Sequence, residues 1–186
     1  MSTTEVPNIV FILADDLAVW AAGCYGNTEI RTPNLDRIAA TGVRFENFFV
    51  TIPVCSASRA SFLTGRIPSQ HGVHDFIGGP ANFGEEGPVF LGDEVCYTNV
   101  LADNGWSCGI SGKWHLGSSS LPQCGFSHWF VHPGGAGGYN DHSMVRDGVT
   151  EVMPGYVTNV ITDDALGYID AHAEDETPFY LSVHYT

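Results

Sequence analysis

The stretch from Pro53 to Gly65, PVCSASRASFLTG, holds the residues whose types and spacing are most suited to chemistry. Small residues around Cys55 run into a segment whose composition suits a short helix, and Gly65 can end that helix. If the helix begins near Cys55, Arg59 lies one turn further along the same face. A helix N-terminus beside a guanidinium is suited to binding an anion. The alternative is a buried structural cysteine followed by a surface arginine, which is the usual case for a lone cysteine.

Two adjacent carboxylates follow an apolar run near the start of the chain. The run from Asn8 to Ala14 is rich in β-branched residues and predicts a central strand of a sheet that helices cover on both faces. Asp15 and Asp16 then lie at the carboxyl end of this strand, where ligands bind in open α/β sheets. Paired carboxylates at that place suit Ca²⁺ or Mg²⁺, and an acidic turn without a metal is the alternative.

A third candidate is the run GKWHLG at residues 112–117. Lys113 and His115 are two residues apart, so in an extended backbone both point to one face and can approach a single ligand. A Walker phosphate-binding loop is excluded because Trp114 replaces the hydroxyl residue that would bind Mg²⁺, and Ser107 stands where the first glycine is needed.

These three segments resemble the sulfatase family, in its formylglycine-dependent type I form. The first resembles the signature Cys-x-Pro-Ser-Arg with its Leu-Thr-Gly ending, and it matches at Cys55, Ser58, Arg59 and residues 63–66. Ala57 stands where the family usually has proline. The third resembles the family's Gly-Lys-Trp-His signature, and the start of the chain resembles its opening strand with paired metal ligands.

The resemblance implies a role for each catalytic candidate. Cys55 is the precursor of formylglycine, which a maturation enzyme produces and which acts, as a hydrate, both as nucleophile and as metal ligand. Arg59 holds the diol, Lys113 contacts the sulfate, and His115 contacts the diol and transfers protons. One hydroxyl of the diol attacks sulfur, and the other then expels sulfate.

The resemblance also implies a metal site and a substrate pocket. By resemblance, Asp15 and Asp16 bind Ca²⁺, or alternatively Mg²⁺, together with the modified Cys55. His71 and His74 follow the first signature closely. We expect them to line or brace the pocket, with His74 as a substrate-binding candidate, rather than to form a second metal site.

The fold that the resemblance implies is α/β, an alkaline-phosphatase-like sandwich whose central, mostly parallel sheet is flanked by helices. Residues 1–186 then form the N-terminal part of a sulfatase catalytic domain, without the remainder of that domain or the C-terminal domain. The apolar run at residues 178–186 has the pattern of a strand, and the sequence stops on it. The implied function is hydrolysis of a sulfate monoester, of a sulfated carbohydrate or an aryl or alkyl sulfate. Two alternatives stay open: a phosphonate or phosphate monoester hydrolase of the same superfamily, and an inactive fragment that needs a complementing chain.

Composition narrows the class of protein. A chain of 186 residues with 44 % hydrophobic residues predicts one globular unit. The net charge of −14 argues against nucleic acid or a membrane as partner, and the start shows no signal peptide. The five cysteines include no Cys-x-x-Cys pair, which fits a reducing compartment. We therefore expect a cytoplasmic protein, or a periplasmic or secreted one if a leader is missing.

The remaining elements position these candidates. Helical patterns cover residues 32–39, 97–104 and 158–169, and strand patterns cover 43–48, 106–111 and 178–186. Gly- and Pro-rich stretches at 78–92 and 125–139 predict loops. On the last helix, Asp163 and Asp164 diverge, and we expect both to be solvated.

Overall fold

The computed structural model describes residues 6–186, and the chain divides into two compact units. One unit comprises the segment up to Leu13 together with Thr51–Thr186, and the other comprises Ala14–Val50. The expected single globular unit is therefore wrong. The smaller unit has its own contacts because its short elements, η1 (Val19–Ala21), η2 (Gly23–Tyr25) and α1 (Pro33–Thr41), pack on one another.

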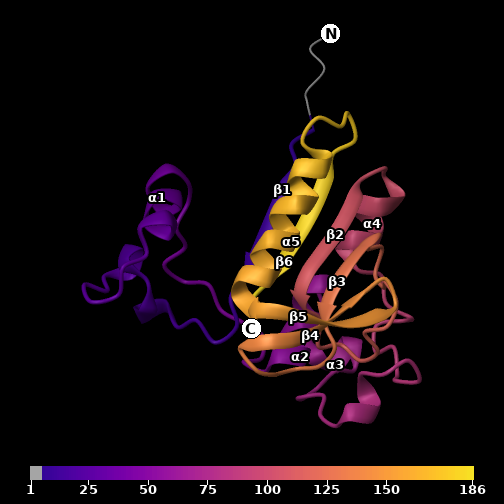
Figure 1. The fold of residues 1–186 in the computed structure, drawn as a ribbon. Coiled ribbons are helices and arrows are strands. Elements are labelled where there is room, and N and C mark those ends of the chain that lie inside the picture. Colours follow the sequence, from indigo (N-terminus) through magenta and orange to yellow (C-terminus); the bar gives the residue numbers. More distant parts are fainter. Residues whose placement is uncertain (1–5) are drawn as a thin grey trace. The chain divides into compact units, whose positions relative to one another are not determined.

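The larger unit is built on one six-stranded sheet with the order β1-β6-β2-β3-β4-β5 (Figure 1). The strands are β1 (Ile9–Leu13), β2 (Ser107–Lys113), β3 (His128–His132), β4 (Asn140–Arg146), β5 (Val149–Tyr156) and β6 (Phe179–His184). The neighbours β1, β6, β2 and β3 run parallel, and the β4–β5 hairpin is antiparallel. The prediction of a mostly parallel sheet in an α/β fold is confirmed.

Helices cover both faces of this sheet. Along β6, Phe179, Leu181 and Val183 join a cluster with the apolar stripe of α5 (Val157–His172). Tyr180, which points to the opposite face, joins the larger cluster formed with α2 (Cys55–Thr64) and with residues that flank α4 (Tyr97–Asp103). This alternation of side chains along a strand is what a sheet between two helical layers requires.

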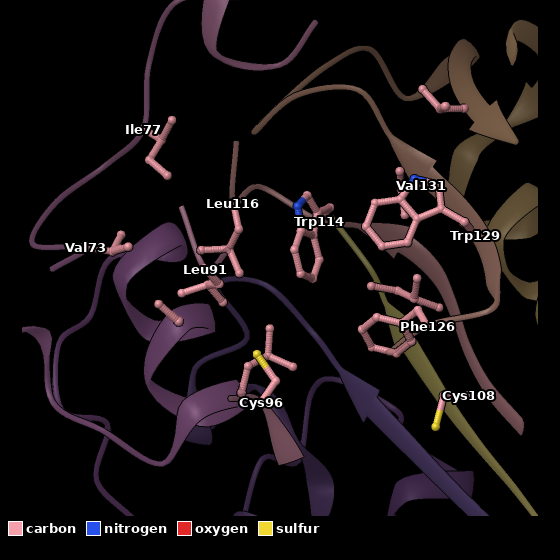
Figure 2. Packing of buried hydrophobic residues seen from close by; sticks show 14 of the residues in the cluster. Val73, Ile77, Leu91, Cys96, Cys108, Trp114, Leu116, Phe126, Trp129 and Val131 are labelled. Carbon is pink, nitrogen blue, oxygen red and sulfur yellow. The ribbon is translucent and has the colours of Figure 1, made fainter. Parts of the chain in front are cut away.

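The larger cluster anchors the Lys-Trp-His run. Figure 2 shows Trp114 beside Trp129 and Phe126, and the ring centroids of the two tryptophans are 5.1 Å apart. Trp114 is buried, as is Leu116. Core packing at these positions therefore fixes the backbone on either side of His115.

Most predicted elements are present, with three corrections. The helices α1, α2, α4 and α5 and the strands β2 and β6 are confirmed within a few residues. No strand forms at residues 43–48, and the expected loop at 125–139 contains β3. The opening strand β1 lies at the edge of the described sheet rather than at its centre, with Ile12 exposed. The larger unit also contains two short helices, α3 (Pro68–His71) and η3 (Pro80–Asn82).

The expectation that Asp164 is solvated is wrong. Its side chain is 5 % exposed and pairs with His128 at 2.9 Å and with Arg146 at 2.8 Å, while Ser111 donates a further hydrogen bond. Burial alone would raise the pKa of Asp164, but these hydrogen bonds outweigh it and the pKa is lowered. The carboxylate thus ties α5 to β2, β3 and β4, whereas Asp163 is exposed as expected.

No helix in the described part of the chain is both long enough and apolar enough to span a membrane.

Candidate active site

The helix that carries Cys55 and Arg59 forms as the sequence predicts. The helix α2 begins at Cys55 and ends at Thr64, and Gly65 follows in the left-handed conformation with φ of 67°. Ala57, Ala60 and Leu63 face the core, so the helix is held along one side. Cys55 is half-buried at the first position, and Arg59, one turn later, is only 2 % exposed.

Arg59 joins this helix to the ends of two strands. Its Nη1 donates to the backbone oxygen of Lys113 at 2.7 Å and lies 3.0 Å from Nδ1 of His184. The same His184 nitrogen lies 3.0 Å from the Lys113 oxygen. A guanidinium stays protonated in proteins, so these contacts hold a buried positive charge where β2 and β6 end.

The close approach of β2 and β6 depends on Gly112. This residue has φ of 111°, and a Cβ built on it would lie 1.9 Å from the backbone oxygen of His184. The glycine of the Gly-Lys-Trp-His run is therefore required by the backbone, because any side chain would separate the two strand ends.

His115 is buried with a fixed ring orientation. Its Nε2 lies 3.0 Å from the carbonyl oxygen of Ile77, and the rings of Phe76 and Phe83 pack against it at centroid distances of 4.8 Å and 5.6 Å. The Ile77 amide in turn donates to Oγ of Ser56 on α2 at 3.2 Å. Because a carbonyl oxygen only accepts, Nε2 carries the proton and Nδ1 has the lone pair in the neutral ring.

Lys113 has His132 as its neighbour on the next strand. The two residues are Cα partners in the parallel pairing of β2 with β3, and Lys113 is 4 % exposed. The pKa of His132 is lowered to about 4, mainly by burial; electrostatic repulsion from His142, Lys113 and His115 acts in the same direction, and the hydrogen bond with Gly134 opposes it. The lysine charge is therefore close to a ring that stays neutral at pH 7.

The two predicted metal ligands, Asp15 and Asp16, lie in the smaller unit. Asp15 is half-buried, and Asp16 is exposed with φ of 56°, in the turn that follows β1. Among residues 6–186, no group of three or more His, Cys, Asp or Glu side chains is arranged to hold a metal ion. Two carboxylates suit Ca²⁺ or Mg²⁺ by their donor chemistry, but they do not by themselves make a site.

The two histidines after the signature lie in different surroundings. His71 is buried, and its Nε2 lies 3.0 Å from Oγ of Ser61, so it braces α2; its role in lining or bracing the pocket stays a prediction. His74 is exposed. Its role as a substrate-binding residue stays a prediction.

Sequence reasoning missed two residues that shape this region. His184 ends the apolar run of β6 as the aspartates follow the run of β1, and that polar ending was the available signal. Gly135 lies directly against the proposed catalytic histidine, since a Cβ built on it would lie 2.2 Å from Nε2 of His115. Nothing in the local pattern of glycines indicates this contact.

Comparison with known proteins places this geometry in context. The family model described as Sulfatase matches residues 7–186. The chain is 36 % identical over 183 residues to N-acetylglucosamine-6-O-sulfatase of Bacteroides thetaiotaomicron, covering 97 % of the chain and 30 % of that relative. It is 44 % identical over 117 residues to human arylsulfatase A, covering 63 % of the chain and 22 % of that relative.

Solved structures show the same arrangement of elements. A protein in complex with its substrate D-glucosamine-2-N,6-O-disulfate superposes with a TM-score of 0.81 at 36 % identity, covering 96 % of the chain and 34 % of that protein. The protein Ps i-CgsB in complex with k-i-k-neocarrahexaose superposes with a TM-score of 0.83 at 26 % identity, covering 97 % of the chain and 45 % of that protein. The chain thus spans less than half the length of each of these relatives.

Proposed function

The chain belongs to the sulfatase family, and from that premise we propose that the full-length protein hydrolyses a sulfate monoester of a carbohydrate. The named relatives above are hydrolases of sulfuric esters, and one of them acts on N-acetylglucosamine-6-O-sulfate groups by its name. The chain itself carries the proposed nucleophile, the arginine and the Lys-Trp-His run, so the reaction would be centred on its residues.

One observation carries the proposal: Arg59 Nη1 donates to the backbone oxygen of Lys113 at 2.7 Å. Their separation of 54 positions means that only folding brings the two signatures together. The contact joins the helix that begins at Cys55 to the strand that ends at Lys113. Two buried cations at one sheet edge can bind a sulfate ester despite the net charge of −14.

Each side chain has a proposed task that follows from its chemistry. Lys113 binds the sulfuryl oxygens as a point charge, and Arg59 orients the diol derived from Cys55 through its fork of N–H donors. His115 accepts or returns a proton at Nδ1, because Ile77 holds the other ring nitrogen at 3.0 Å. One diol oxygen forms a bond to sulfur while the ester S–O bond breaks and the alcohol leaves with a proton. The second hydroxyl then loses its proton as the C–O bond to the sulfate breaks, which releases sulfate and the aldehyde, and water hydrates the aldehyde again.

The formylglycine at position 55 and the bound cation are part of this proposal. Cys55, the proposed precursor of formylglycine, is half-buried at the first position of α2. Asp15, Asp16 and the modified Cys55 would supply oxygen ligands to Ca²⁺ or Mg²⁺, with further ligands from outside this chain. When bound, such a cation polarises sulfuryl oxygens and lowers the pKa of a coordinated hydroxyl.

The phosphonate or phosphate ester alternative is not favoured, because the named relatives reported above are sulfatases. Rates on matched aryl sulfate and aryl phosphonate substrates test it directly. We expect the full-length protein to prefer the sulfate, and a preference for the phosphonate would reverse the assignment.

Intact mass tests the nucleophile independently of any rate. Conversion of Cys55 to formylglycine lowers the mass by about 18 Da, and a Cys55→Ala variant must not show that loss. An unmodified Cys55 in an active preparation would contradict the proposed mechanism. Modified protein without activity on any sulfate ester would contradict the proposed reaction.

A further inference from the structure

A cavity of about 550 Å³ lies beside the proposed sulfate site, within the larger unit. Its walls include Phe83, Glu85, His132, Gly134 and His142. The size falls within the range of small-molecule sites in proteins. We call it the imidazole pocket, after its two histidines.

The two imidazoles of this pocket are stacked, with ring centroids 4.0 Å apart and planes inclined by 23°. His132 is 1 % exposed, and its Nδ1 lies 3.1 Å from the Gly134 amide nitrogen and 2.9 Å from the Gly134 oxygen. Nε2 of each ring is buried and has no hydrogen-bond partner among residues 6–186. Two buried polar atoms side by side without partners indicate a place where a ligand completes the hydrogen bonding.

The charge of the pocket selects the class of ligand. Burial lowers the pKa of both rings, so both are neutral at pH 7. Its lining residues include Glu85 and neither Lys nor Arg. An anionic group is disfavoured here, whereas a hydroxyl can both donate to and accept from a neutral imidazole. Phe83 adds an apolar face that suits the C–H surface of a sugar ring.

The pocket shares its wall with the proposed sulfate site. Phe83 lines the pocket and also packs against His115, with 5.6 Å between the ring centroids. Gly134 lines it, and the next residue, Gly135, lies directly against the His115 ring. His132 is the strand neighbour of Lys113. A molecule whose sulfate lies at Lys113 and His115 can therefore extend over this wall into the pocket.

We propose that the imidazole pocket is a subsite for an uncharged, hydroxyl-bearing sugar ring that adjoins the sulfated ring of the substrate. This proposal rests on the proposed sulfatase function. Gly137 lies over the two Nε2 atoms, since a Cβ built on it would be 2.8 Å from Nε2 of His132 and 2.5 Å from that of His142. Binding then requires a shift of the glycine-rich backbone at residues 134–138, where no side chain larger than a methyl group has to move.

A substrate comparison on the full-length protein tests this subsite. The two probes are 4-nitrophenyl sulfate, which has no second ring, and a disaccharide with one sulfated ring and one unsulfated neutral ring. His142→Phe keeps the stacked plane and removes both ring nitrogens. We expect the ratio of kcat/KM on the disaccharide to kcat/KM on the aryl sulfate to fall by about 10-fold or more, mainly through KM.

Matched variants separate a binding role from a structural one. His142→Gln retains a donor and an acceptor and should restore most of the ratio. His172→Phe makes the same change on α5, outside the pocket, and should leave the ratio at the wild-type value. A ratio that His142→Phe leaves unchanged would overturn the subsite, whereas a wild-type protein that hydrolyses neither probe would overturn the proposed function instead.

The charge argument has its own experiment. A second sulfate on the neutral ring should lower kcat/KM, and Glu85→Gln should recover part of that loss by about threefold to tenfold, since a like charge is removed. A doubly sulfated disaccharide that is hydrolysed faster than the singly sulfated one would show that the pocket binds an anion, and would refute the proposed ligand class.

Discussion

Replacing Gly135 by alanine should displace the proposed catalytic histidine. A Cβ at this position would lie 2.2 Å from Nε2 and 2.3 Å from Cε1 of His115, whereas real Cβ contacts under 3.0 Å essentially never occur. Either the His115 ring or the loop that contains residue 135 must therefore move by about 0.8 Å or more. A displaced ring would leave the position in which Nε2 lies 3.0 Å from the Ile77 oxygen and the Phe76 and Phe83 rings pack against it.

We expect the histidine to move, with a loss of about 100-fold in kcat/KM, because a misplacement near 1 Å typically costs that much in catalysis. Overpacking of a buried site should also lower the free energy of unfolding by about 1 to 3 kcal/mol. The assay is hydrolysis of 4-nitrophenyl sulfate by the full-length protein, normalised to formylglycine content by intact mass.

Gly138→Ala is the matched control. A Cβ on Gly138 has its nearest neighbour, the Asn140 oxygen, at 3.7 Å, which is an ordinary contact. Both glycines lie in the same loop and neither has a left-handed φ. If Gly135→Ala and Gly138→Ala have kcat/KM values within twofold of each other, the loop rather than His115 yields, and the argument that the glycine positions the histidine fails.

Three further changes test other parts of the structure. Arg59→Lys should lower kcat/KM on an aryl sulfate by about 100-fold, because an ammonium cannot reproduce the guanidinium fork, and a rate near wild type would contradict that role. The pKa of His132 is about 4 against 6.5 for an ordinary histidine, so below pH 6.5 the unfolded chain gains a proton that the folded protein resists. This group should therefore lower the free energy of unfolding by about 1.4 kcal/mol for each pH unit between pH 6.5 and 4. His132→Gln should reduce that pH dependence in thermal unfolding, and an unchanged pH dependence would contradict the role of His132. Asp164→Asn should lower the free energy of unfolding by about 2 to 3 kcal/mol in urea, whereas Asp163→Asn, on the exposed side, should change it by less than about 0.5 kcal/mol; equal effects would show that the buried pairs do not matter.

Some of the fold and of the site could be predicted because it depends on short stretches of sequence. The helix from Cys55 to Thr64 with its glycine end, and the strand that ends at Lys113, follow from local composition and spacing. Membership of the sulfatase family could also be predicted from the sequence, because the family's signatures are contiguous runs of residues. The roles of Cys55, Lys113 and His115 remain proposals that rest on those runs.

Contacts between distant positions could not be predicted in this way. Arg59 and His184 are 125 positions apart, and only the parallel pairing of β6 with β2 brings them together. Asp164 belongs to an acidic pair that the sequence alone predicts as solvated, and its burial follows from how α5 packs on the sheet. Local patterns constrain dihedral angles and the faces of an element, so they determine which segments form. Which side chains meet depends on strand order and helix packing, and for this protein the tertiary structure alone decided that His115 lies against Gly135.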